Sequence, residues 1–266
     1  MSYLQHFGLK HDPLGKNIHN VVHSHQEEKL VQQLNWLLQT KGVALITGDA
    51  GTGKTTVLRE WAGTLNPMTH HVIYQSDNHF KAFDIYSQLA DNLGLEKYSR
   101  YSTLWRALKQ ELLHLIDHKQ LAPIWILDEA HLIPVNFLAE LPAFLNFSFD
   151  NREVITIILV GLPTLQATLK KSIYSALHSR TLFQFNWQSI DDSNKFREFI
   201  TEAFKNAGIH DVIISHSGME LIYMASKGRL RYAHRILTQA FQKAAKENCK
   251  HLPDEIIQQT IEILVS

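Results

Sequence analysis

The sequence contains a single cysteine, Cys249, among its 266 residues. One cysteine excludes an intramolecular disulfide and a thiolate metal cluster, and it is typical of a reducing compartment. The sequence also lacks an apolar run that approaches roughly 20 residues, the length that a helix needs to cross a membrane. The first twelve residues do not have the basic and apolar pattern of a signal peptide. We therefore expect a cytoplasmic protein with no membrane partner.

The chain also lacks a net charge, because 26 lysines and arginines balance 26 aspartates and glutamates. A global basic field is excluded, so any contact with nucleic acid must come from a local patch. Hydrophobic residues make up 45% of the chain, enough for a sizeable core, which argues against disorder.

A glycine-rich stretch after an apolar segment, residues 43–47, matches every specified position of a phosphate-binding loop: Gly48, Asp49, Ala50, Gly51, Thr52, Gly53, Lys54 and Thr55. A helical pattern that opens with Thr56 follows, and we count Thr56 among the nucleotide contacts. Glycines let the backbone turn its N–H groups toward a phosphate, and the helix start adds its positive dipole end. We expect Lys54 to reach the β- and γ-phosphates of ATP, and the Thr55 hydroxyl to bind Mg²⁺.

A second motif lies at the end of a continuous apolar segment, residues 124–127, where Asp128 and Glu129 follow directly. An apolar strand that delivers two acids at its carboxyl end is the Walker B arrangement. Asp128 is expected to hold Mg²⁺, and Glu129 to orient and deprotonate the attacking water. The same residues with His131 spell a helicase box, but such a helicase needs two sheet domains and this chain has room for one. His131 is then a loop residue or, alternatively, a nucleotide sensor.

Apolar strand patterns alternate with helical patterns up to about residue 188, which predicts a mostly parallel sheet covered on both faces. The expected strands are residues 43–47, 72–74, 124–127, 154–160 and 182–186. Helical segments then follow near 191–207, 216–226, 230–248 and 253–264. We expect an N-terminal extension, 1–23, an α/β nucleotide-binding domain, 24–188, and a helical lid, 189–266. The predicted fold is an αβα P-loop NTPase with a five-stranded, mostly parallel sheet and a small all-α lid.

The chain resembles the AAA+ ATPases of the transposition-regulator group (TniB, TnsC and MuB), which are related to the ExeA-type ATPases. The resemblance covers nearly the whole chain, and it is carried by these segments: Phe7-Gly8-Leu9, His25, the phosphate loop, residues 128–131, residues 159–163 and Gly228-Arg229-Leu230-Arg231. The two phosphate-site motifs alone would indicate only a general P-loop ATPase. The resemblance to this particular group depends on two further segments, the turn Gly161-Leu162-Pro163 and the segment Gly228 to Arg231.

The resemblance implies an ATP-dependent regulator of DNA transposition that uses ATP and Mg²⁺. Such a protein assembles as a ring or helical filament on double-stranded DNA and recruits or activates a transposase, and hydrolysis drives release. The alternatives are an ExeA-like ATPase of an envelope secretion system and a signalling switch without DNA. The sequence does not indicate the DNA preference, the transposase, the oligomer size or the turnover rate.

The resemblance also implies roles for two arginines. Arg180, just before the last strand, stands where the family carries an arginine finger that reaches a neighbour's γ-phosphate; the alternative is a surface arginine. Arg231 matches the sensor arginine of the lid, with Arg229 and Arg235 as competitors. Leu162 departs from the polar residue that the family often has there, so no first sensor residue is assigned.

Candidate DNA contacts lie after the second expected strand: Lys81, Arg100, Arg106 and Lys109. The last three are interleaved with Tyr98, Tyr101 and Trp105. In the related transposition proteins, loops from this region line a channel around duplex DNA. The alternative is a solvated helix face whose aromatic residues face the core. His114 and His118 lie one helical turn apart, but without a third ligand they are expected to be a solvated or capping pair rather than a metal site.

Overall fold

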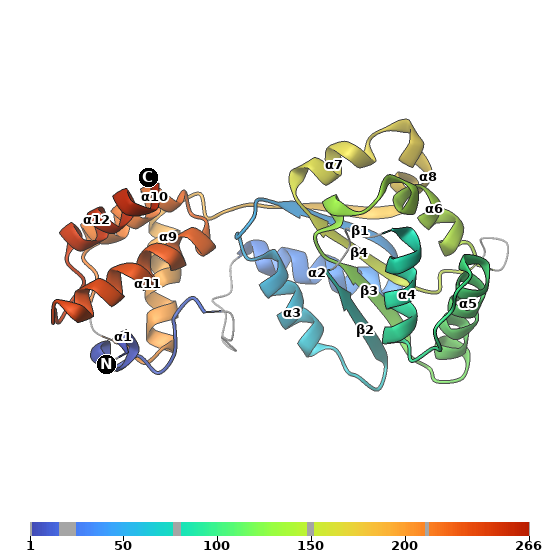
Figure 1. Cartoon of the computed structure of the whole chain (residues 1–266), viewed down its shortest axis with the longest axis horizontal. Coiled ribbons are helices and arrows are strands. Elements are labelled where there is room, and N and C mark those ends of the chain that lie inside the picture. The colour runs from blue at the N-terminus through green and yellow to red at the C-terminus, as the bar shows by residue number, and fades with distance from the viewer. Residues whose placement is uncertain (1, 16–24, 77–80, 148–151, 211–212, 266) are drawn as a thin grey trace. The chain divides into compact units, whose positions relative to one another are not determined.

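The computed structural model describes residues 2–15, 25–76, 81–147, 152–210 and 213–265. Its contacts divide the chain into two compact units (Figure 1). The sheet unit contains residues 25–48 and 57–187, and the helical unit contains residues 1–24, 49–56 and 188–266. The phosphate loop therefore clusters with the helical unit, although it follows the central strand of the sheet unit directly in the chain.

Five strands form one sheet in the order β2-β3-β4-β1-β5. Their bounds are β1 (Gly42–Gly48), β2 (His70–Gln75), β3 (Ala122–Leu127), β4 (Thr156–Gly161) and β5 (Thr181–Trp187). Every pairing within the sheet is parallel, which confirms the predicted fold class. Because the strands are parallel, all their carboxyl ends meet at one edge of the sheet, which is where open α/β sheets bind ligands.

Helices cover both faces of the sheet. They are α2 (His25–Thr40), α3 (Lys54–Thr64), α4 (Ala82–Asn92), α5 (Tyr101–Asp117), α6 (Val135–Leu145), α7 (Pro163–Leu169) and α8 (Ser175–Ser179), with 3-10 turns η1 (Ala130–Leu132) and η2 (Ser172–Tyr174). Side chains alternate along β1, where Val43 and Leu45 pack into the core under α4 to α8, whereas Ala44 and Ile46 pack into the core under α2 and α3. This alternation explains why β1 is buried over its whole length.

The helical unit has its own apolar core. It contains α1 (Tyr3–Phe7), α9 (Ser193–Asn206), α10 (His216–Ser226), α11 (Leu230–Lys246) and α12 (Asp254–Val265). Helix α11 is strongly amphipathic and supplies much of the core, including Ile236, Leu237 and Phe241. The four C-terminal helices agree with the expected helical segments to within about two residues.

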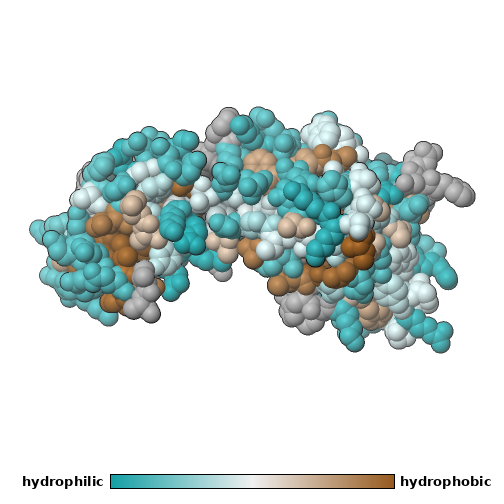
Figure 2. All heavy atoms as spheres, turned by 90° about the horizontal axis from the view of Figure 1, so that it is seen from above, coloured by the Kyte–Doolittle hydropathy of each residue, from teal (hydrophilic) through white to brown (hydrophobic). Residues whose placement is uncertain are grey.

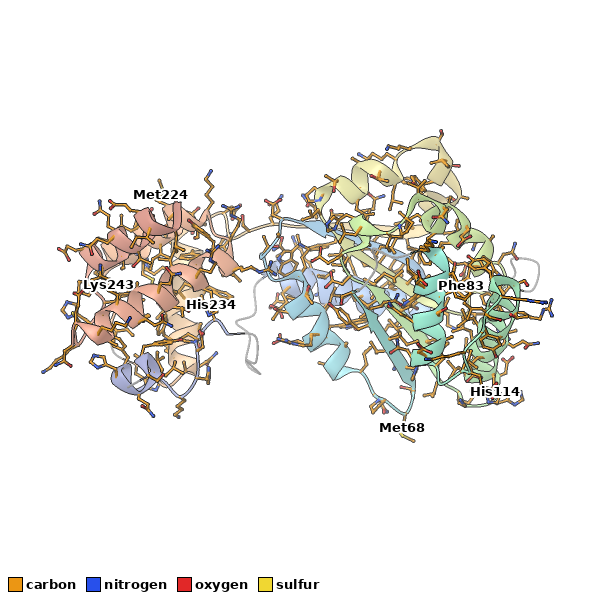
Figure 3. All side chains as sticks on the ribbon, viewed as in Figure 1. Met68, Phe83, His114, Met224, His234 and Lys243 are labelled. Carbon is orange, nitrogen blue, oxygen red and sulfur yellow. The ribbon has the colours of Figure 1, made fainter. Side chains whose placement is uncertain are left out.

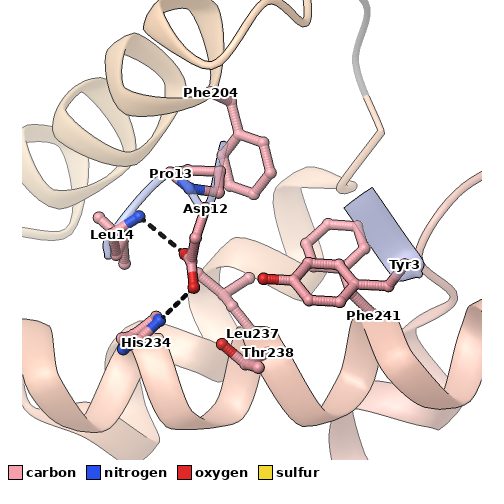
Figure 4. A pocket seen from close by; sticks show the side chains of 9 residues that line it. All are labelled: Tyr3, Asp12, Pro13, Leu14, Phe204, His234, Leu237, Thr238 and Phe241. Atoms are coloured by element: carbon pink, nitrogen blue, oxygen red, sulfur yellow. Dashed lines mark hydrogen bonds and ion pairs between the residues drawn. The ribbon is translucent and has the colours of Figure 1, made fainter. Parts of the chain in front are cut away.

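The N-terminal residues pack on this core, an arrangement that the sequence did not indicate. The ring of Phe7 meets that of Phe241 edge to face, with centroids 4.8 Å apart. Lys10 N–H donates a hydrogen bond to Ala207 O at 2.9 Å. Asp12 accepts one from His234 Nε2 at 2.7 Å beside a small cavity, into which the Tyr3 hydroxyl points (Figure 4).

The remaining differences from the sequence prediction are local. Helices α1 and α8, of five residues each, are too short to give a periodic sequence pattern. Strand β4 begins at Thr156, two residues later than expected, because Val154 and Ile155 are buried without pairing to a neighbouring strand. The apolar pattern of α4 in the sequence predicts a helix from Phe80 to Leu93, and Phe80 lies outside the described residues.

The surface is mainly hydrophilic on the face shown in Figure 2, and apolar side chains gather there in a few patches. Met68, in the turn before β2, is 79% exposed, and Figure 3 labels it at that turn. Among the described residues, no helix is both long and apolar enough to cross a bilayer.

The Asp12 carboxylate is expected to stabilise the helical unit in a pH-dependent way. Burial opposes its charge, but the hydrogen bond and charge of His234 outweigh burial and hold the pKa of Asp12 below its usual value. A lowered pKa means that stability is present above about pH 4 and is lost as the pH falls through the folded-state value. Asp12→Asn should therefore lower the free energy of unfolding by about 1 kcal/mol at pH 6, and the deficit should shrink as the pH falls below about 4.

Urea unfolding at a series of pH values measures this difference. Glu198→Gln, which removes the same charge from an exposed position on α9, is the matched control and should show no such deficit. A deficit that is absent at pH 6, or that is unchanged at pH 3, would contradict the stabilising role of Asp12.

Candidate nucleotide site

The phosphate loop begins at Gly48, the last residue of β1, which pairs with Trp187 of β5. A side-chain Cβ placed on Gly48 would lie 2.1 Å from the backbone oxygen of Trp187, far inside van der Waals contact. Gly48 and Trp187 are partners in the parallel register of the two strands. Glycine is therefore required at position 48 by the packing of the sheet, before any ligand is considered.

The loop itself uses glycine conformations that other residues rarely adopt. Gly51 and Gly53 have φ angles of 77° and 108°. Two side chains fold back on one carbonyl group, since Lys54 Nζ and Thr52 Oγ1 donate to Asp49 O at 2.7 and 2.8 Å. Helix α3 then starts at Lys54, and its first N–H groups have no acceptor within the helix. This arrangement suits an anion at the helix start.

Arg231 touches the loop within the helical unit. Its backbone N–H donates to Gly51 O at 3.0 Å, and a Cβ on Gly51 would lie 2.5 Å from Arg231 Cβ. The competing Arg229 uses its Nε to bond Ser226 O at 3.1 Å. Arg235 is exposed on α11. Of the three candidates, Arg231 is the one that the structure brings to the phosphate loop.

The two acids after β3 have different surroundings. Asp128 is only 4% exposed, and its Oδ1 accepts the Glu129 N–H at 2.8 Å. Glu129 has a left-handed backbone, with φ of 52°, and its side chain is 54% exposed. The exposed carboxylate lies 3.5 Å from His131 Nδ1. A buried acid beside an exposed one is the arrangement expected for a metal ligand followed by a general base.

Strand polarity relates the loop to these acids. β1 and β3 run parallel with β4 between them, so both strands end at the same edge of the sheet. The residues suit a magnesium nucleotide, because the loop offers backbone N–H groups for phosphate, and Thr55 and Asp128 offer the oxygen donors that Mg²⁺ prefers. Asp49, Ala50 and Thr55 are exposed, as ligand-facing positions require.

Arg180 lies at the opposite edge of the sheet. It immediately precedes β5, and its carbonyl oxygen accepts the Val43 N–H at the amino end of β1. Its guanidinium lies 3.4 Å from Glu153 Oε1, and the side chain is 18% exposed. Arg152, on the same edge, pairs with Asp117.

The candidate DNA contacts separate into two kinds. Lys81, Arg100 and Arg106 are exposed. Lys81 immediately precedes α4 and Arg100 immediately precedes α5. The two helix starts lie close together, because the rings of Phe83 and Tyr101 have centroids 6.2 Å apart.

Lys109 has a structural role instead. Its Nζ donates to Asn146 O at 2.5 Å and lies 4.6 Å from the centre of the Phe147 ring. Burial lowers the pKa of this lysine. The ammonium group therefore caps the carboxyl end of α6, where a positive charge is stabilised by the helix dipole, and we leave Lys109 out of the proposed DNA surface.

The sequence analysis did not identify two residues that contact the candidate site residues. Tyr74 donates its hydroxyl to Asp128, and Glu153 pairs with Arg180. Neither contact has a local sequence signal, because each depends on the register between strands or on loop packing. The rings of His114 and His118 have centroids 5.0 Å apart, and no group of three metal-binding side chains occurs in the described part of the chain.

The chain is similar in sequence to one characterised protein and similar in fold to several solved structures. The chain is 25% identical over 248 residues to general secretion pathway protein A of Aeromonas hydrophila, covering 90% of this chain but only 44% of the relative's length. The fold is similar to that of the Aeropyrum pernix ORC2 protein, solved as ADPNP–ADP complexes, with a TM-score of 0.73 and 20% identity over 95% of this chain and 71% of the other. It is also similar to the Aeropyrum pernix ORC1 protein in complex with DNA, with a TM-score of 0.70 and 17% identity over 95% of this chain and 68% of the other.

A family model described as an AAA domain matches residues 37–169. The matched region runs from the end of α2 to the end of α7 and includes the phosphate loop, both acids and the first four strands. Because the match spans half of the sequence, the chain belongs to the AAA domain family.

Proposed function

We propose that this chain binds and hydrolyses ATP at the carboxyl edge of its sheet. The observation that carries the proposal is the complete phosphate loop after β1 together with the buried Asp128 and exposed Glu129 after β3. Membership of the AAA domain family supports ATP hydrolysis, and the fold is similar to that of the ORC2 protein solved with ADPNP and ADP.

Each residue has a distinct role in this proposal. Lys54 and the loop N–H groups bind phosphate, and Arg231, which contacts the loop at Gly51, is the sensor arginine that binds the nucleotide. Thr55 and Asp128 would hold Mg²⁺, which offsets phosphate charge when bound. Glu129 is free to turn toward water because its side chain is half exposed, and it accepts the proton of the attacking water.

We further propose that the chain works as an assembly on duplex DNA and regulates transposition by recruiting a transposase. Support comes from the exposed cations at the starts of α4 and α5, and from the similarity in fold to the ORC1 protein solved with DNA. A neutral chain can still bind DNA in this way, because an assembly repeats a small patch along the phosphates.

A second candidate is an ATPase module of a secretion system. The match to general secretion pathway protein A favours it, although the chain spans less than half the length of that relative. The two candidates share ATP hydrolysis and differ in DNA binding, so the DNA experiment below separates them.

The assignment of Glu129 can be tested by Glu129→Gln. This variant should bind ATP with unchanged affinity, because the side chain contacts water rather than phosphate, but hydrolyse it at least ~100-fold more slowly. Calorimetry measures binding, and phosphate release measures hydrolysis. Lys54→Ala should lose binding itself, and Glu262→Gln, an exposed acid on α12, is the matched control with wild-type values. Wild-type turnover by Glu129→Gln would refute its role as the base.

The DNA proposal predicts affinity that depends on ATP, tolerates any duplex sequence and falls steeply with salt. Lys81→Gln and Arg106→Gln should weaken binding to all sequences alike and lower the salt slope by about one per contact removed. Fluorescence anisotropy with labelled duplexes measures both quantities.

Lys195→Gln, which removes an exposed charge on α9, is the control for the lost charge and should leave binding unchanged. If no complex forms at low salt with ATP present, the DNA proposal fails and the secretion candidate is favoured.

The position of Arg180 determines how it can act. β5 has seven residues, so Arg180 lies on the order of 20 Å from the edge where β1 ends. An arginine at the amino edge is too distant for a phosphate bound at the carboxyl edge of its own sheet. We therefore propose that Arg180 serves the ATP of a neighbouring copy, and that Glu153 holds its guanidinium until that copy arrives.

A mixture of two inactive variants tests this proposal. Arg180→Ala and Glu129→Gln should each hydrolyse ATP poorly, but mixed assemblies contain interfaces with an intact Glu129 on one subunit and an intact Arg180 on the next. These interfaces should restore activity, because an added arginine increases phosphoryl-transfer rates by orders of magnitude. Arg152→Ala, at the same edge, should remain active alone. An inactive mixture that co-assembles by mass measurement would leave Arg180 as a surface arginine.

A further inference from the structure

The carboxylate of Asp128 is held by a residue from the neighbouring strand. The Tyr74 hydroxyl donates to Asp128 Oδ2 at 2.8 Å, while Glu129 N–H donates to Oδ1 at the same distance. The backbone is also fixed, since Asp128 N–H donates to Gln75 O at 2.8 Å. Both carboxylate oxygens and the main chain of Asp128 are thus bound to neighbours at the end of β3.

The register of the sheet explains why Tyr74 reaches this position. Within the described residues β2 is an edge strand, paired with β3 alone, and Tyr74 lies opposite Ile126, two residues before Asp128. Ile73 and Gln75 are buried on one face of β2, so Tyr74 points to the other face, where it is 48% exposed. The same face carries Ile126 and packs under α2 and α3.

A tyrosine hydroxyl is chemically suited to orient a carboxylate that binds a metal. A tyrosine hydroxyl is protonated at neutral pH, so Tyr74 is the donor in its hydrogen bond to Asp128 Oδ2. A neutral donor fixes the plane of the carboxylate but leaves its negative charge, whereas a lysine or arginine would compete with the cation.

We propose that Tyr74 is a positioning residue for Asp128, which sets the carboxylate in the orientation that binds the Mg²⁺ of the nucleotide complex. This inference rests on the proposed ATP binding and assigns a role to a residue outside the phosphate loop and the two acids. The competing explanation is that Tyr74 only stabilises the edge of the sheet.

Tyr74→Phe separates these explanations, because it removes the hydroxyl oxygen and keeps the ring. Affinity for ATP is measured by calorimetry with excess Mg²⁺ and again with EDTA. We expect a roughly ten-fold loss of affinity with Mg²⁺, the usual scale for a group that orients a metal ligand, and no change with EDTA. The Mg²⁺ concentration for half-maximal binding should rise correspondingly.

Two further variants make the test specific. Tyr98→Phe, at another half-buried tyrosine of the same unit, is the matched control and should behave as wild type. Asp128→Asn should lose the Mg²⁺-dependent affinity, and adding Tyr74→Phe to it should change nothing more, because Tyr74 acts through Asp128. Circular dichroism checks that each variant is folded.

The outcomes distinguish this inference from the proposed function. Equal affinity of Tyr74→Phe and wild type with Mg²⁺ overturns the positioning role and leaves ATP binding intact. An equal loss with Mg²⁺ and with EDTA also overturns it, in favour of a structural role. Wild-type protein that does not bind ATP under either condition overturns the proposed function and this inference together.

Discussion

The pairing of β1 with β4 and β5 is the constraint on which the candidate site depends. β1 is buried along its whole length and has a parallel partner on each side. At its last residue the contact with Trp187 leaves no room for a side chain on Gly48. The start of the phosphate loop is therefore fixed by the sheet, and Gly51 and Gly53 supply the positive φ angles with which the loop turns.

Because the strands are parallel, charged residues that follow a strand and charged residues that precede one lie at opposite edges of the sheet. Asp128 and Glu129 follow β3 at the carboxyl edge, whereas Arg180 and Glu153 lie at the amino edge. In our proposal, one subunit therefore presents a nucleotide at one edge and an arginine at the other. A heterologous contact of this kind repeats from copy to copy and gives a ring or a helical filament, according to whether the rotation closes.

The sequence was informative where chemistry is local. The phosphate loop, the acids after β3 and all five strands could be predicted, because glycine spacing and apolar runs are contiguous in the chain. The contact of Lys109 with Asn146 could not be predicted, since a cation on a helix face does not indicate that the end of α6 lies beside it. Tyr74 was placed on a strand, but its contact with Asp128 follows only from the pairing of β2 with β3. The register between strands that are distant in the chain cannot be predicted from a single sequence.

The same central strand has a consequence for how the chain folds. During synthesis β1 leaves the ribosome before β4 and β5, the strands that pair with it, which lie more than a hundred residues later in the chain. Such distant pairings carry a large loop-closure cost and are slow to form. Until they form, Ala44, Leu45 and Ile46 form an unpaired apolar strand, the kind of segment that chaperones protect from aggregation. The phosphate loop is thus completed late, and a nucleotide that binds it would favour the finished sheet over its partly folded precursors.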